Sequence, residues 1–238
     1  MIVGVNQPYW IPYLGYFSLI GTVDIFVPLD TVLFSRKSWV GRNFLTSGGR
    51  PFLNSIPLVK ASQNMAIRDL SIDFGQNWRE KTLVSLSRNY RQTAASKPVL
   101  EMVENWFDNP PGNLSLFLVG TIRDISSRLG FSTEILGSDA EVIEPTSGLR
   151  GQDRILAISE HLHADTYVNL PSGRSLYNRE SFEAKDIRLE FTVAVPPELE
   201  EPGQPYKSIL AHLMEVGFDS TRAEIERHSR FLERENLG

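Results

Sequence analysis

The sequence contains no cysteine among its 238 residues. Disulfide bonds, thiolate metal sites and cysteine nucleophiles are therefore excluded as sources of stability or chemistry. Histidine is scarce as well, with four in the chain. His161 and His163 are two positions apart, and on a helix this spacing points their rings in different directions. We therefore expect no metal site.

Long apolar runs are also missing. No stretch reaches the roughly 18 apolar residues of a membrane span, and the opening MIVGVNQ lacks the basic segment and long apolar segment of a secretory signal. The net charge of −5 argues against broad binding to nucleic acid or anionic lipid. We expect a cytoplasmic protein that acts on a small-molecule substrate, with its oligomeric state open.

The residues that are present favour an α/β fold. Met1–Val5 is a short apolar run typical of a buried parallel strand, residues 15–21 (GYFSLIG) suit a short helix, and residues 23–30 suit a second strand. Such a short β-loop-α-β unit predicts a parallel pair with its loop at the carboxyl edge, where open α/β sheets place their ligands.

The rest of the chain continues this pattern. Further strands are expected at 53–59, 132–139, 165–170 and 187–195, and helices at 77–90, 97–107, 114–129, 154–162, 206–217 and 220–236. We predict one α/β domain over residues 1–238, a Rossmann-like, mainly parallel sheet flanked by helices. A helical insertion occupies the middle of the chain, with a helical subregion at 77–129 and a charged helical tail at 219–238.

The first candidate site is the loop from Gln7 to Tyr16, which is too elaborate for a simple βα connection. Pro8 and Pro12 stiffen it, and the following helix offers free N–H groups to an anion. Its candidate binding residues are Gln7, Tyr9, Tyr13 and Gly15, with Tyr16 as a candidate proton-transfer group. The alternative is that the aromatic side chains pack beneath the sheet edge.

The second candidate site is the segment DTVLFSRKSWVGRN, residues 30–43. Asp30 stands at a predicted strand end, and arginine pairs well with phosphate or carboxylate, so this segment predicts an anion site. A solvated basic loop would look similar. The candidate binding residues are Ser35, Arg36, Ser38, Trp39, Arg42 and Asn43.

The third candidate site is the loop PSGRSLYN at 171–178, which follows another predicted strand end. In a parallel sheet this loop shares an edge with the first two sites, which predicts one pocket. Its candidate residues are Asn169, Ser172, Gly173 and Arg174. Asn89 and Tyr90 at a helix end are further binding candidates. For these two residues and for Arg150–Arg154, the pattern favours capping or surface pairing over catalysis.

Standard catalytic motifs are absent: the sequence has no G-x-G-x-x-G, no G-x-x-x-x-G-K-[ST], no G-x-S-x-G and no H-E-x-x-H. General base work would therefore fall to Asp30, a tyrosine such as Tyr16, or a lysine.

The stretches NQPYWIPYLGYF and DTVLFSRKSWVGRN resemble the opening signature of the WbqC-like family. The match continues through SIPLV, NWREKTLVSLSRNY, LGFSTEILGSD and DRILAISEHLHADTYVNLPSGRSLY, so it covers nearly the whole chain. The resemblance implies a bacterial protein of surface polysaccharide or O-antigen biosynthesis. It further implies a small-group transferase, including glycyl or aminoacyl transfer to a sugar, with a nucleotide or activated amino acid as donor.

The chain departs from the family pattern at two places. Thr82 stands where the family commonly has histidine, and residues 202–208 lack the usual H-P-x-Y-x-Q. A weaker similarity to nucleotidyltransferases with an H-x-G-H motif places Leu14, Gly15 and Tyr16 at that motif without its histidines. Two other functions therefore stay open, an ATP-dependent adenylating or nucleotidyl-transferring enzyme and a non-catalytic binding subunit.

Overall fold

The protein is built around a five-stranded sheet in the order β5–β2–β1–β6–β7, in which every neighbouring pair is parallel. The computed structural model describes residues 1–47, 50–137, 141–146, 148–193 and 207–229. The strands are β1 (Ile2–Asn6), β2 (Ile25–Pro28), β5 (Glu134–Ile135), β6 (Thr166–Asn169) and β7 (Arg188–Phe191). This arrangement confirms the predicted Rossmann-like fold.

The central strand β1 sets the position of the loops. Val3 is in register with Ile25 of β2 on one side and with Tyr167 of β6 on the other. Because all three strands are parallel, the chain leaves each of them at the same carboxyl edge. From β1 the sheet grows in one direction through β2 and β5, and the chain then crosses to β6 on the other side of β1. Open α/β sheets bind their ligands beside such a reversal of strand order.

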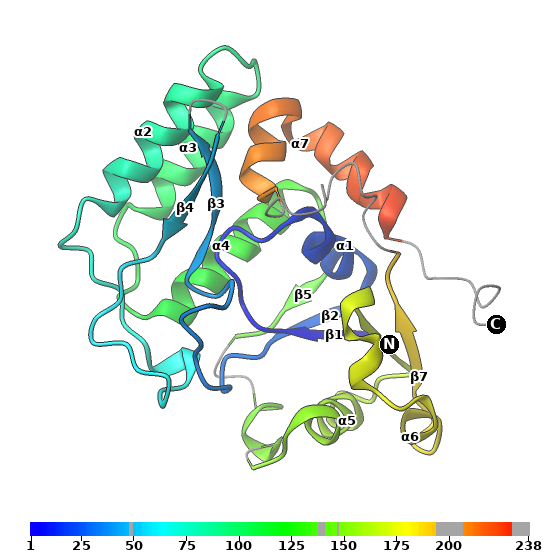
Figure 1. Cartoon of the computed structure of the whole chain (residues 1–238). Helices are drawn as coiled ribbons and strands as arrows, with labels where there is room; N and C mark the ends of the chain where they lie inside the picture. Colours follow the sequence, from blue (N-terminus) through cyan, green and yellow to red (C-terminus); the bar gives the residue numbers. More distant parts are fainter. Residues whose placement is uncertain (48–49, 138–140, 147, 194–206, 230–238) are drawn as a thin grey trace.

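Helices cover both faces of the sheet (Figure 1). One face is covered by α1 (Leu14–Thr22), α4 (Leu114–Arg128) and α7 (Ile209–His228), and the other by α5 (Gly151–His161) and α6 (Arg179–Glu183). Successive strand residues divide between two cores, since Phe26 and Val168 belong to the first and Val27 and Tyr167 to the second. Burial on both faces explains the nearly continuous apolar strands.

A second unit of structure lies between β2 and β5 and contains the helical insertion. Strands β3 (Arg42–Ser47) and β4 (Arg50–Ser55) form an antiparallel hairpin against which α2 (Trp78–Tyr90) packs, and α3 (Ser96–Trp106) packs against α2 and α7. Short 3-10 segments are η1 (Ile67–Asp69), η2 (Glu144–Thr146) and η3 (Pro171–Leu176). The insertion therefore stands beside the sheet's carboxyl edge (Figure 1).

Two expectations change in the structure. The strand expected at 53–59 is β4, which ends at Ser55 and pairs with β3, a strand the sequence analysis did not predict. The helices expected at 206–217 and 220–236 are one element, α7, kinked at Gly217 with φ 80° and ψ 178°. Parts of the predictions for 187–195, 202–208 and 219–238 lie outside the described residues.

We found no helix in the described ranges that is long and apolar enough to cross a membrane.

Candidate functional site

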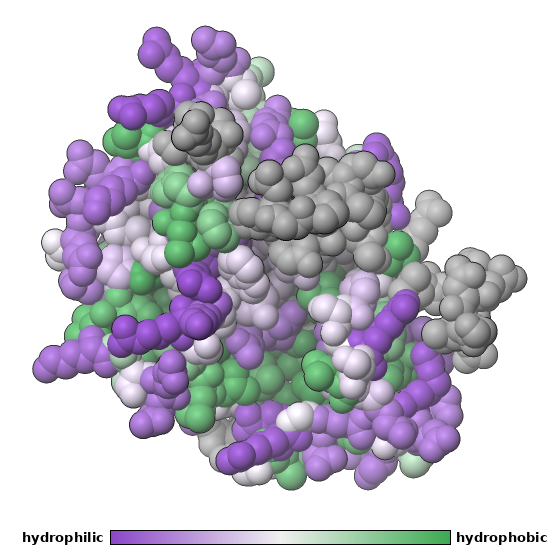
Figure 2. Space-filling view, in the orientation of Figure 1, coloured by the Kyte–Doolittle hydropathy of each residue, from purple (hydrophilic) through white to green (hydrophobic). Residues whose placement is uncertain are grey.

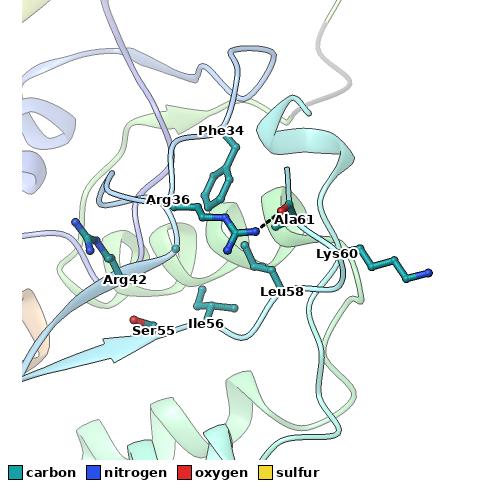
Figure 3. Close-up of a pocket in the computed structure, with 9 residues that line it drawn as sticks. Phe34, Arg36, Arg42, Ser55, Ile56, Leu58, Lys60 and Ala61 are labelled. Atoms are coloured by element: carbon teal, nitrogen blue, oxygen red, sulfur yellow. Dashed lines mark hydrogen bonds between the residues drawn. The ribbon is translucent and has the colours of Figure 1, made fainter. Parts of the chain in front are cut away.

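The clearest candidate site is a cavity of about 280 Å³ beneath the β3–β4 hairpin, which we call the cationic cavity (Figure 3). Its walls come from the β2–β3 connection and from the chain around β4. The lining residues are Phe34, Arg36, Gly41, Arg42, Ser55, Ile56, Leu58, Lys60 and Ala61. Three of these side chains are cationic and none is acidic, so the cavity suits an anionic ligand.

Arg36 lies across the cavity, and its Nη2 donates to the carbonyl oxygen of Ala61 at 2.6 Å (Figure 3). The turn that carries it is closed by Ser38, whose N–H and hydroxyl both donate to the carbonyl oxygen of Ser35, at 3.0 and 2.7 Å. Phe34 and Ile56, each 5% exposed, form an apolar floor. The Arg36 side chain is exposed, and its guanidinium is held by the Ala61 carbonyl beside this apolar floor.

Arg42 and Lys60 lie on opposite sides of the cavity, and both side chains point away from Arg36 (Figure 3). The Nη2 of Arg42 donates to the carbonyl oxygen of Lys37 at 2.5 Å, and its guanidinium lies 6.0 Å from the centre of the Trp39 ring. Its Nε is buried and has no hydrogen-bond partner among the described residues. Figure 2 shows hydrophilic residues beside hydrophobic ones over this part of the surface, below the hairpin.

Asp30 lies at the other end of the same connection, two residues after β2, and is fully buried. Its Oδ2 accepts a hydrogen bond from the hydroxyl of Ser115 on α4. Its Oδ1 is buried and has no partner in the described part of the chain. Burial raises the pKa of Asp30 above its ordinary value, although the Ser115 hydrogen bond and the charge of Arg68 oppose the shift. The carboxyl group therefore keeps a proton to higher pH than an exposed aspartate.

Tyr16 is also fully buried, and its hydroxyl donates to the carbonyl oxygen of Gln7 at 2.8 Å. Burial raises the pKa of Tyr16 well above its ordinary value, and the nearby Tyr9 and Tyr13 add to the shift. The Tyr9 ring lies 5.4 Å from that of Tyr16, and Gly15 is buried in the first turn of α1. The Tyr16 hydroxyl therefore holds the backbone at Gln7, immediately after β1.

The first loop is also attached to the hairpin. The Asn43 side chain donates to the carbonyl oxygens of Trp10 and Ile11, at 3.1 and 2.8 Å. Trp10 Nε1 donates to Asn54 Oδ1 at 2.8 Å, and its ring lies 5.4 Å from that of Trp78. For Trp10 the structure supports the alternative of aromatic packing, because this side chain has no exposed surface.

The third loop is held by Asn169, which is 8% exposed at the end of β6. Its Nδ2 donates to the hydroxyls of Tyr167 and Tyr177, at 3.0 and 2.9 Å. A Cβ on Gly173 would stand 2.9 Å from that same Nδ2, so the glycine permits close packing. Arg174 is exposed and its guanidinium lies 5.7 Å from the centre of the Phe191 ring, and Ser172 is also exposed.

Asn89 and Tyr90 belong to the insertion. Asn89 Nδ2 donates to the carbonyl oxygen of Ser85 at 2.6 Å within α2, and Tyr90 is buried in the larger core cluster. Neither residue lines the cationic cavity.

The structure thus separates the predicted residues into two places. Arg36 and Arg42 line the cationic cavity, whereas Gln7, Asp30 and the Asn169 loop follow strands that end at the carboxyl edge. Two antiparallel segments, 30–36 and 61–68, connect the two places. They are joined by hydrogen bonds from Arg68 N to Asp30 O at 3.0 Å, Ile67 N to Val32 O at 3.1 Å and Phe34 N to Met65 O at 2.9 Å.

Sequence reasoning did not single out Lys60, which lines the cationic cavity, or Arg68, which pairs with the chain at Asp30. Lys60 follows directly on the apolar run LNSIPLV, which is the signal that could have drawn attention to it. Arg68 carries no such signal, because it comes next to Asp30 only through pairing of distant segments.

Thr82, where the resemblance implies a histidine, is fully buried in α2. Its hydroxyl accepts from Asn54 Nδ2 at 2.8 Å and donates to the carbonyl oxygen of Trp78 at 2.9 Å. Thr82 and Trp10 therefore belong to the same hydrogen-bond network, which is joined through Asn54. The segment 202–208 is the other place where the sequence differs from the pattern that the resemblance implies, and its residues 202–206 lie outside the described residues.

The described residues contain no group of three or more histidine, aspartate or glutamate side chains placed to hold a metal ion.

Comparison with known proteins identifies the family. An uncharacterized protein of Mycobacterium tuberculosis is 29% identical over 190 residues, which cover 79% of this chain and 80% of that protein. No solved structure matches the chain. The WbqC-like protein family matches residues 7–223, and the chain therefore belongs to that family.

Proposed function

We propose that the protein is a small-group transferase whose cationic cavity binds the anionic part of an activated donor. The donor carries a glycyl or other aminoacyl group, and the acceptor is a sugar or another small molecule of surface polysaccharide or O-antigen biosynthesis. The observation that carries this proposal is the cavity itself, which combines Arg36, Arg42 and Lys60 with no acidic lining residue.

The local chemistry supports binding of a phosphate or carboxylate. Arg36 is held in place by Ala61, so little side-chain freedom is lost when a ligand binds. Arg42 also lines the cavity, and its guanidinium charge favours an anion there. The floor of Phe34 and Ile56 supplies apolar contacts beside the charged groups.

Of the two predicted proton-transfer groups, Asp30 is better suited than Tyr16. Its Oδ1 has no partner among the described residues and its pKa is raised toward neutrality. The Tyr16 hydroxyl already donates to Gln7, and its pKa moves further from neutrality.

A second function, a non-catalytic binding subunit, is favoured by one observation. Asp30 and Tyr16 are both fully buried, and neither lines the cationic cavity. A protein that only holds an anionic intermediate needs the cavity and no proton-transfer group.

The first experiment measures binding. Wild type, Arg36→Gln, Arg42→Gln and the control Lys97→Gln, an exposed residue of α3, are melted with nucleotide-sugars, ATP and aminoacyl phosphate analogues. A ligand at 100 times its Kd raises the unfolding free energy by about 2.7 kcal/mol. We expect one donor class to stabilise wild type and Lys97→Gln and to lose most of this effect in the two arginine variants. Equal stabilisation of all four proteins would contradict a role for the cavity.

The second experiment separates the functions. The stabilising donor is incubated with enzyme in excess and with candidate acceptors, and group transfer is followed by mass spectrometry. Transfer that is abolished in Asp30→Asn supports the transferase, and binding without transfer supports the binding subunit. Stabilisation by ATP with Mg²⁺, followed by release of pyrophosphate, would instead support the adenylating enzyme.

A further inference from the structure

Gly41 lines the cationic cavity at the point where the chain enters the β3–β4 hairpin. It directly precedes β3, and its carbonyl oxygen accepts from the N–H of Ile56 at 2.8 Å. The pairing of the hairpin therefore continues one step beyond Arg42 and Ser55, and Gly41 is buried. A glycine in a paired segment often marks a place where another group approaches the backbone closely.

The backbone φ angle of Gly41 does not explain why a glycine stands at this position, because it lies outside the left-handed region that Gly217 occupies. A Cβ added to Gly41 would stand 3.7 Å from Cε2 and Cζ of Phe34 and 3.9 Å from Cδ1 of Leu58, which are ordinary van der Waals distances. These atoms are apolar carbons of side chains that line the cavity. Gly41 therefore leaves a methyl-sized apolar space, which we call the Gly41 niche.

The Gly41 niche belongs to the same cavity as the Arg36 guanidinium. Figure 3 shows this guanidinium pointing toward Ala61, on the side of the cavity where Leu58 lies. Only Nη2 of Arg36 has a hydrogen-bond partner among the described residues, so its other N–H groups can donate to a ligand. A cationic group and an apolar niche thus share a cavity of about 280 Å³, a volume that suits a small ligand or one part of a larger one.

We propose that the ligand of the cationic cavity is an amphipathic anion, and that Gly41 is the specificity residue that admits its apolar part. The phosphate or carboxylate of the ligand accepts hydrogen bonds from Arg36. The apolar group attached to it fills the Gly41 niche against Phe34 and Leu58. This inference rests on the proposed function, because it takes the cavity as the donor site. The apolar group is then the side chain of the donor's aminoacyl group, which favours a small apolar side chain over a glycyl group.

The first test uses two series of anions of increasing size. The carboxylates are formate, acetate, propionate and isobutyrate, and the phosphonates are methyl-, ethyl- and propylphosphonate. Their affinities are measured by NMR titration at constant ionic strength for wild type, Gly41→Ala, Gly112→Ala and Arg36→Gln. Gly112→Ala is the matched control, because Gly112 is exposed and an added Cβ there meets nothing within 4 Å.

In wild type and Gly112→Ala, we expect the carbon that enters the Gly41 niche to raise the affinity about fourfold, the effect of burying one CH₂ group. We expect Gly41→Ala to lose this step, because its own methyl group fills the niche, and to bind formate as wild type does. The series that binds more tightly identifies the anionic group as carboxylate or phosphonate.

The outcomes separate this inference from the proposed function. Equal affinities along both series in wild type, or a step that persists in Gly41→Ala, would overturn the role of Gly41 and leave the cavity as an anion site. If wild type binds no anion of either series, or Arg36→Gln binds them equally well, the anion site itself is wrong, and both the proposed function and this inference fall.

A second measurement uses wild type alone and does not depend on the folding of any variant. The δ-methyl signals of Leu58 are followed during titration with propionate, and nuclear Overhauser effects are sought between the ligand methyl group and the Phe34 ring. We expect saturable movement of the Leu58 signals and no movement of those of Leu53, an exposed leucine of β4 that does not line the cavity. Propionate that binds without moving the Leu58 signals would contradict the proposal.

Discussion

Single asparagine side chains hold the candidate loops of this protein in place. Asn43 connects the hairpin to the first loop, Asn169 holds the third loop, and Asn113 joins α4 to the carbonyl oxygen of Arg68 at 2.6 Å. An amide suits this task because it donates and accepts at once. Asn43 and Asn169 were ligand candidates in the sequence, and the structure shows that their amides are already engaged.

The first residue prediction concerns Asn43, which is 4% exposed. We expect Asn43→Ala to lower the free energy of unfolding by about 2–4 kcal/mol, because two buried carbonyl oxygens lose their donor. Urea denaturation measures the change, and the exposed Asn64→Ala is the control. A loss below about 0.5 kcal/mol, the usual range of a surface change, would show that the loop does not depend on this amide.

The second residue prediction compares two glycines. Alanine at Gly173 would place a Cβ 2.9 Å from Asn169 Nδ2, while alanine at Gly112 would meet nothing within 4 Å. Since the two tyrosine hydroxyls hold the Asn169 amide, we expect Gly173→Ala to destabilise by about 1–3 kcal/mol and Gly112→Ala to stay within about 0.5 kcal/mol. Thermal unfolding monitored by circular dichroism tests the difference. Equal melting temperatures of the Gly173→Ala and Gly112→Ala variants would mean that η3 can shift to accept the added Cβ at no cost in stability.

Local patterns predict whole elements well in this chain when the signal is contained in the element itself. The helices expected at 77–90, 97–107 and 114–129 are observed at 78–90, 96–106 and 114–128, because apolar spacing and the flanking breaks define them locally. Strand β3 was missed because RNFLTS becomes a strand through pairing with β4, and its alternation is too short to stand out.

The element prediction uses the same substitution in two helices. Gly120 lies on the exposed side of α4 with nothing within 4 Å of an added Cβ, so Gly120→Ala should stabilise by about 0.5–1 kcal/mol. Gly217 bends α7 with φ 80° and ψ 178°, a conformation reserved for glycine, so Gly217→Ala should destabilise by about 1–3 kcal/mol. Chemical denaturation of both variants measures the two signs. A Gly217→Ala variant that is more stable than wild type would mean that α7 can straighten without losing stability.

At the scale of the whole molecule, the sequence predicted which segments share an edge, but it did not predict how far from that edge the cationic candidate residues lie. Parallel strand order follows from short βα units, and it brings the first and third loops together as expected. The position of Arg36 depends on the pairing of 30–36 with 61–68, which carries Arg36 away from the sheet end. Such pairing is non-local and leaves no periodic signal in either segment.

The pH dependence of stability is also a property of the whole molecule, because it sums every group whose pKa changes on folding. His212 contributes the clearest change. It is 7% exposed in the first turns of α7, and burial, helped by Lys207 and opposed by Glu215 and Glu224, lowers its pKa from 6.5 to about 4. The folded protein therefore holds His212 neutral, while the unfolded chain takes up a proton near its ordinary pKa.

The sign follows directly: this contribution is complete above pH 6.5 and is lost as the pH falls toward 4, with a total of about 3 kcal/mol. The raised pKa of Asp30 changes the stability in the opposite direction over pH. The contribution of His212 is therefore measured as the difference between the His212→Gln variant and wild type. We expect His212→Gln to be less sensitive than wild type to acid between pH 6.5 and 4 in urea denaturation, and the exposed His161→Gln to follow wild type. If His212→Gln loses stability as steeply as wild type over this range, His212 takes up its proton at the same pH in the folded protein as in the unfolded chain, and the packing of α7 against α1 and α3 accommodates that charge.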